Sequence, residues 1–276
     1  MLVGYVRSAP YNIVRLTRLY LTMNLNDSVY IGIDPASGNK DFSYAVLDVN
    51  LNLVTLSDAD MDEMVAFLAE RDSTFVAVNA PVRVNQGLVK KRLEDGRSIP
   101  GRTLRGADIR LAEYELHERG IAVTGTPSRE EFCPAWMQVG FALYQKLSEM
   151  GFKPYGVADA TCQVLETQPY ACFCVLIDGT PLPKSTLEGR LQRQLILGDR
   201  GLRITDAMSF FEEITRFKLM KGILPTDVLY SPEQLDVLVA AYTAWLAANR
   251  PDEITEIGDS TEGKLILPAR ELKEKY

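Results

Sequence analysis

Histidine is almost absent from this 276-residue sequence, and His117 in the charged segment EYELHERG is the single example. A histidine-based catalytic triad or a metal site built from several histidines is therefore not expected. The four cysteines, Cys133, Cys162, Cys172 and Cys174, lack the paired spacing of a zinc site. Three of them sit among apolar residues, which is typical of buried free thiols. These absences leave carboxylates as the main carriers of chemistry.

Long apolar runs and an excess of positive charge are also missing. No run approaches 18 uncharged apolar residues, so no membrane-spanning segment and no membrane partner are expected. The net charge of -7 does not favour binding of nucleic acid to the protein surface as a whole, so any such binding must use a local basic region. The composition suits a cytoplasmic protein, and its 46% apolar content is enough for a sizeable core.

The first 22 residues differ from the rest in having three arginines, no acidic residue and an amphipathic stretch, YNIVRLTRLYLT. A secretory signal would need a longer apolar core and a small-residue cleavage site. We expect residues 1–22 to be an N-terminal extension outside the core, with Met23 as the natural beginning. Residues 23–276 are then expected to form a single domain.

The order of apolar patterns predicts a mixed α/β fold. Strands are expected at 29–34, 44–49 and 51–56, then a helix at 57–72 and a buried strand at 74–81. Three antiparallel strands followed by parallel ones, with helices on the faces, would result. We also expect a fifth strand at 162–169 and a closing strand at 264–268. The basic stretch at 82–102 is expected to be a loop.

Further helices are expected at about 103–120, 134–150, 185–197, 205–222 and 231–249. Ser185 and Glu188 have the spacing of a capping box at the start of the helix at 185–197. Ser231, Pro232 and Gln234 combine a capping box with a proline at the first helical position.

Acidic residues end or begin several elements that are otherwise apolar. Asp34 ends the first strand, Glu166 ends the fifth, and Asp236 lies near the start of the last helix on the same face as Glu233. Buried carboxylates without a partner are costly. If they converge, a divalent cation is the simplest way to hold them, and oxygen-only ligands favour Mg²⁺ or Mn²⁺.

Each acidic residue also has a purely structural interpretation. Asp34 before Pro35 could start a turn, and Glu233 and Asp236 could simply favour a helix N-terminus. Glu166 could pair with an arginine from the next helix. The residue types alone leave these alternatives open.

Several motifs in a fixed order point to a known family: GIDPASG, VAVNAPV, RGADIRLAEYEL, ETQP, KSTLEGRLQRQL, EQLDVLVAAYTAWLA and EGKLILP. Over residues 29–268 the sequence resembles the family called domain of unknown function 429, described as predicted RNase H-like nucleases. The resemblance implies an RNase H-like mixed sheet with helical insertions. It also implies Asp34, Glu166 and Asp236 as catalytic metal-binding acids, with Glu233 as a further ligand.

Two positions depart from the pattern of that family. Asn79 stands where an aspartate is typical, and Gln168 stands where a histidine is common. The first change removes a potential ligand or base, and the second removes a potential proton relay. A site altered in this way would be weakened, so a catalytically weakened binding protein of the same fold is one alternative function.

Metal-dependent hydrolysis of phosphodiester bonds in nucleic acid, by a two-metal mechanism, is the leading expectation. The basic stretch would then contact the phosphate backbone through a set of five cations: Lys90, Lys91, Arg92, Arg97 and Arg102. A solvated surface run is the plainer interpretation of the same residues. A third function, ATP binding in an actin-like or sugar-kinase-like fold, shares the strand order, but DPASGNKDFSY lacks the hydroxyl-rich hairpin of such proteins.

Overall fold

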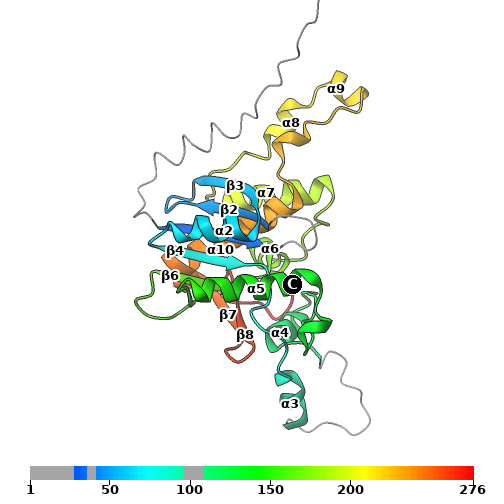
Figure 1. Cartoon of the computed structure of the whole chain (residues 1–276). Coiled ribbons are helices and arrows are strands. Elements are labelled where there is room, and N and C mark those ends of the chain that lie inside the picture. The colour runs from blue at the N-terminus through cyan, green and yellow to red at the C-terminus, as the bar shows by residue number, and fades with distance from the viewer. Residues whose placement is uncertain (1–27, 36–41, 96–107) are drawn as a thin grey trace, which may run out of the picture.

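The computed structural model describes residues 28–35, 42–95 and 108–276. They form an eight-stranded mixed sheet in the order β3-β2-β1-β4-β6-β8-β7, with β5 also paired to β6 (Figure 1). The strands are β1 (Val29–Asp34), β2 (Phe42–Leu47), β3 (Leu53–Ala59), β4 (Thr74–Val78), β5 (Lys153–Pro154), β6 (Cys162–Glu166), β7 (Thr255–Asp259) and β8 (Gly263–Leu267). The mixed α/β fold expected from the sequence is confirmed.

Strand directions change at β1, the central strand of the order β3-β2-β1-β4-β6. β1 is antiparallel to β2, which is antiparallel to β3, whereas β1 is parallel to β4, and β4 is parallel to β6. β8 continues the parallel run beside β6 through one pairing, Glu166 with Leu265, and β7 is antiparallel to β8. The carboxyl ends of β1, β4 and β6 therefore lie along one edge of the sheet.

Helices cover both faces of the sheet (Figure 1). They are α2 (Met61–Ala69), α3 (Leu88–Asp95), α4 (Leu111–Glu118), α5 (Ala135–Glu149), α6 (Pro169–Ile177), α7 (Leu187–Asp199), α8 (Ser209–Glu213), α9 (Arg216–Met220) and α10 (Pro232–Asn249), with 3₁₀ turns at Glu130–Phe132, Thr226–Val228 and Pro251–Glu253. None of the helices in the described ranges is long and apolar enough to cross a membrane.

Successive side chains of β1 point to opposite faces of the sheet and belong to two different hydrophobic cores. Val29, Ile31 and Ile33 pack with α2 and α5 on one face, while Tyr30 belongs to the core of α6 and α10 on the other. This period of two is the behaviour of a strand buried on both faces.

The sheet and a helix approach closely at Gly32. A Cβ atom there would lie 2.1 Å from the Val237 carbonyl oxygen and 2.4 Å from the Ala241 amide nitrogen of α10. The backbone of α10 therefore rests directly on the backbone of β1, which only glycine permits.

Helix starts agree with the sequence at α10 and differ at α7. Ser231 and Gln234 form the expected capping box at the start of α10. At α7 the N-cap is Thr186, whose side chain accepts a hydrogen bond from the Gly189 amide, so the predicted Ser185 and Glu188 box is wrong by one residue.

Two other predictions are wrong in their local detail. The stretch expected as a loop at 82–102 contains α3, and the single helix expected at 205–222 is broken at Ile214 into α8 and α9. Helix α6 and strand β7 were not predicted. The expected extension at 1–22 lies outside the described residues.

Candidate functional site

Asp34 lies where β1 and β4 end side by side. Asn79 follows β4, and its backbone amide donates to the Ile33 carbonyl oxygen at 2.8 Å. Its side-chain Nδ2 donates to Asp34 Oδ1 at 3.0 Å. The amide at position 79 thus orients the Asp34 carboxylate without neutralising it.

The pKa of Asp34 is raised from 3.8 to about 7. Burial is the largest cause, and the negative charges of Asp236 and Glu233 add to it. The hydrogen bond from Asn79 and the positive charge of Lys184 act in the opposite direction without cancelling it. Among the described residues, the one cation that acts on Asp34 is Lys184, and it does not offset the effect of burial.

Asp236 reaches the same region from the second turn of α10. It is buried, and Lys184 Nζ donates to its Oδ2 at 2.8 Å. Burial nevertheless raises the pKa of Asp236, with Glu233 adding to the effect and Lys184 and Arg193 opposing it. The structure thus places Asp236 and Glu233 close enough to Asp34 to raise its pKa, and Lys184 is a described cation that acts on both aspartates.

Lys184 is a partly exposed cation of this cluster. Its side chain is 55% exposed, although its ammonium group is paired with a buried carboxylate. Burial would lower its pKa, but the charges of Asp236, Asp34 and Glu233 outweigh that and raise it. The long stem lies toward solvent, so the ammonium can be displaced without unfolding α7.

Glu166 has a different environment from the one expected. Arg110, just before α4, binds both of its oxygens: Nη1 donates to Oε2 at 2.9 Å and Nη2 to Oε1. The Val82 amide donates to Oε2 as well, at 2.9 Å. Glu166 is 4% exposed and Arg110 is 2% exposed, so this is a buried bidentate ion pair.

Glu113 completes the ion-pair network around Arg110. Its Oε1 accepts from Arg110 Nε at 2.8 Å, and its Oε2 accepts from the Thr126 amide at 2.8 Å. Burial alone would lower the pKa of Arg110, but Glu166 and Glu113 raise it, so the guanidinium stays charged. The interpretation of Glu166 as the partner of an arginine holds, although the arginine precedes α4 rather than belonging to the next helix.

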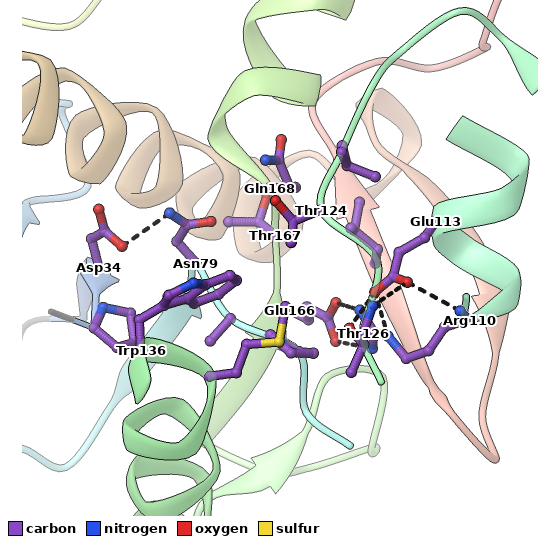
Figure 2. Close-up of a pocket in the computed structure, with 16 residues that line it drawn as sticks. Asp34, Asn79, Arg110, Glu113, Thr124, Thr126, Trp136, Glu166, Thr167 and Gln168 are labelled. Atoms are coloured by element: carbon purple, nitrogen blue, oxygen red, sulfur yellow. Dashed lines mark hydrogen bonds and ion pairs between the residues drawn. The ribbon is translucent and has the colours of Figure 1, made fainter. Parts of the chain in front are cut away.

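A cavity of about 180 Å³ joins the two groups of acids. Figure 2 shows Asp34 and Asn79 at one end, Glu166 with its arginine at the other, and the Trp136 indole between them. Gln168 also lines the cavity, but its Oε1 accepts from the Ala171 amide and so caps α6. Asp34 and Glu166 thus border one cavity from opposite ends.

No group of three or more histidine, cysteine, aspartate or glutamate side chains in the described ranges has a geometry that could hold a metal ion. Arg110 pairs with Glu166, so the described structure does not bring Asp34, Glu166 and Asp236 together as one such group, and their expected role as common metal ligands stays a prediction. The remaining acids, Asp34 and Asp236 with Glu233 nearby, offer at most a site that water or substrate oxygens would have to complete.

The basic residues of the expected substrate surface are only partly described. Lys90, Lys91 and Arg92 are exposed on α3, which extends away from the sheet (Figure 1). Arg97 and Arg102 lie outside the described residues. Exposed cations on a projecting helix are available for a phosphate backbone.

Two residues of the site were missed in the sequence. Arg110 is part of the motif RGADIRLAEYEL, and an arginine three residues before Glu113 could have indicated a local ion pair. Lys184 precedes the α7 cap, and nothing local connects it to Asp236, 52 residues later.

The chain was compared with known proteins at the levels of family, sequence and structure. No curated protein and no solved structure matches it. A family model described as "Protein of unknown function (DUF429)" matches residues 32–262. This match covers both Asp34 and Asp236, and the resemblance drawn from the motifs is confirmed. The chain therefore belongs to the DUF429 family.

Proposed function

We propose that the protein hydrolyses phosphodiester bonds in nucleic acid with Mg²⁺ or Mn²⁺ bound at Asp34 and Asp236. One observation carries the proposal: the partly buried Asp34 of β1 and the buried Asp236 of α10 lie close enough for Asp236 to raise the pKa of Asp34, and Lys184 does not cancel that effect. A site with this deficit of positive charge favours a divalent cation.

The residues present fit a hard cation. Mg²⁺ is commonly held by one or two carboxylates, with waters and substrate phosphates as its other ligands. Asp34 and Asp236 supply the two carboxylates, and Glu233 adds negative charge beside them. A bound cation would polarise a phosphate oxygen and lower the pKa of a coordinated water.

The protein's own residues would assist in three ways. Asn79 keeps the Asp34 carboxylate in place through the hydrogen bond at 3.0 Å. Lys184, once released from Asp236, provides an ammonium group for a substrate phosphate. Glu166 contributes indirectly, because its ion pair with Arg110 anchors the end of β6 and the far end of the cavity.

The strand order supports this proposal over other α/β functions. The order β3-β2-β1-β4-β6, antiparallel on one side of β1 and parallel on the other, is that expected of an RNase H-like sheet. In such a sheet an acid at the end of the first strand and an acid on the late helix across it would form the metal site. Asp34 and Asp236 occupy those two places.

Thermal unfolding with increasing Mn²⁺ tests the metal site before any substrate is known. Mn²⁺ at 100 times its dissociation constant should stabilise the wild type by about 2.7 kcal/mol. Asp34→Asn and Asp236→Asn should abolish this stabilisation. Asp62→Asn, which changes an exposed aspartate on α2, should leave it unchanged.

Glu166→Gln separates this geometry from the three-acid site expected at first. The variant should be less stable than the wild type, because Arg110 loses a charged partner, yet it should respond to Mn²⁺ as the wild type does. If Glu166→Gln is no longer stabilised by Mn²⁺, Glu166 is a metal ligand and the two-carboxylate site is wrong.

Activity is then measured on single-stranded and double-stranded DNA and RNA with Mn²⁺. Cleavage that disappears in Asp34→Asn and persists in Asp62→Asn supports the proposal. Binding of metal without cleavage of any of these substrates would indicate the catalytically weakened binding protein. Stabilisation by ATP in place of nucleic acid would indicate the nucleotide-binding alternative.

A further inference from the structure

A projecting arm carries most of the exposed apolar surface of the described residues. The arm, residues 205–230, leaves the body after α7, forms α8 and α9, and returns to α10 (Figure 1). Eleven large apolar side chains are exposed in the described ranges, and seven of them lie on the arm: Met208, Phe211, Phe217, Leu219, Met220, Ile223 and Leu224. Such concentration of apolar surface marks an interaction site.

The root of the arm is held firmly by two side chains of α7. The buried Gln194 donates from Nε2 to the Thr205 and Val228 carbonyl oxygens at 2.8 and 3.0 Å, and its Oε1 accepts from the Tyr230 amide at 2.9 Å. Arg190 Nε donates to the Tyr230 carbonyl oxygen at 2.7 Å. The two chain segments at the root are thus tied to one helix through partly buried hydrogen bonds.

A small separate core supports the same root. Phe210 is 2% exposed and packs with Leu191, Ala207 and Leu229. Phe211, the next residue, makes an edge-to-face contact with it and is itself half exposed. The change from buried to exposed between adjacent phenylalanines marks where the anchored part of the arm ends.

The tip of the arm has a defined backbone conformation, and its apolar side chains are exposed among the described residues. Thr215 caps α9 by accepting from the Lys218 amide at 3.1 Å, and Gly222, with φ of 67°, allows the chain to turn back. Met220 is 75% exposed, Phe217 is 67% exposed and Leu219 is 58% exposed. The described residues therefore form an apolar tip that none of them buries.

Both signs of charge lie on the arm. Glu212 and Glu213 are on α8, whereas Arg216, Lys218 and Lys221 are on or just after α9. One pair, Lys218 with Glu213, is already closed within the arm at 3.6 Å and is exposed. An acidic first helix followed by a basic second one is complementary to itself when two copies are related by a two-fold axis.

We propose that the arm is the surface through which two copies of this chain pair. In a two-fold arrangement the apolar tips cover each other and the basic α9 of one copy meets the acidic α8 of the other. Phenylalanine, methionine and arginine are residues enriched at such interfaces. An anionic lipid surface or a polynucleotide would instead meet Glu212 and Glu213 on the arm, and a chain with net charge of -7.

Sedimentation of the full chain over a range of concentrations tests the pairing. The wild type should sediment as a dimer, and the double variant Phe217→Glu with Met220→Glu should sediment as a monomer. Val49→Glu is the matched control, because Val49 is 52% exposed on the turn between β2 and β3 and is not one of the residues of the arm. The tip side chains are exposed, so both variants should keep the wild-type circular dichroism spectrum.

Cross-linking identifies the contact directly. Met220→Cys in a Cys162→Ser background should form a disulfide between copies in the dimer, and Val49→Cys in the same background should not. The remaining cysteines are buried. A wild type that is monomeric at every concentration, or a dimer that survives the double substitution, overturns the proposal. A monomer that binds vesicles containing anionic lipid through the tip would overturn it as well.

Discussion

Replacing Asp34 by asparagine should stabilise the metal-free protein at pH 8. In the folded protein the pKa of Asp34 is about 7, against 3.8 for an ordinary aspartate. One pKa unit corresponds to about 1.4 kcal/mol, so ionised Asp34 costs the fold about 4 kcal/mol. Asparagine keeps the size of the side chain and can still accept the hydrogen bond from Asn79, but it removes the charge.

The gain should depend on pH in a defined direction. Between about pH 4 and pH 7 the folded state holds the Asp34 proton while the unfolded state has lost it, so wild-type stability falls as the pH rises through this window. Above pH 7 the whole cost is present. The advantage of Asp34→Asn should therefore be about 4 kcal/mol at pH 8 and less than about 2 kcal/mol at pH 5.

Thermal melts in the presence of a metal chelator measure the effect. For a chain of this length about 4 kcal/mol corresponds to an increase in the melting temperature on the order of 10 °C at pH 8. Asp62→Asn should show no such increase at either pH. A lower melting temperature for Asp34→Asn would identify Asp34 as a turn-forming residue, and an increase equal at both pH values would show that its charge is not the cause.

Three further perturbations test other parts of the structure. Arg110→Met should cost about 3–5 kcal/mol in urea denaturation, because it leaves Glu113 and Glu166 buried without their cation; a loss below about 1 kcal/mol would mean that water replaces the guanidinium. Gly32→Ala should destabilise by more than about 4 kcal/mol, measured by circular dichroism melts, because its Cβ would meet the α10 backbone at 2.1 Å. Gly198→Ala, on α7 with nothing within 4 Å, is the matched control and should be neutral or stabilising. Replacing Lys90, Lys91 and Arg92 by alanine should weaken nucleic-acid binding uniformly across sequences and flatten its salt dependence, and an unchanged slope in a binding titration would assign these cations to solubility.

Elements with a local signal were predictable from the sequence. The strand VYIGID and the helix starting SPEQ have clear patterns, an apolar run ending at a polar residue and a capping box with proline, and both are where they were expected. Helix α6 was missed because PYACFCVLI is apolar on nearly every side and buried nearly throughout, so it lacks an amphipathic period.

Site residues were predictable from the sequence where they lie at the end or start of an element that has a clear local pattern. Asp34 and Asp236 follow from their elements, and α10 then brings them together. The partner of Glu166 comes from 56 residues earlier in the chain, and the partner of Asp236 from 52 residues earlier. Pairings over such separations depend on the order of strands in the sheet, which a single sequence does not contain.

The contact at Gly32 determines how much freedom the acidic cluster has. Gly32 is two residues from Asp34, and its nearest neighbour on α10, Val237, is adjacent to Asp236. The two acids are thus carried by main-chain atoms in direct contact, whose separation no rotamer change can alter. Any residue larger than glycine at position 32 would push α10 away from β1 and so widen the separation of the two acids. The spacing of the acidic cluster therefore depends on a glycine that carries no chemistry of its own.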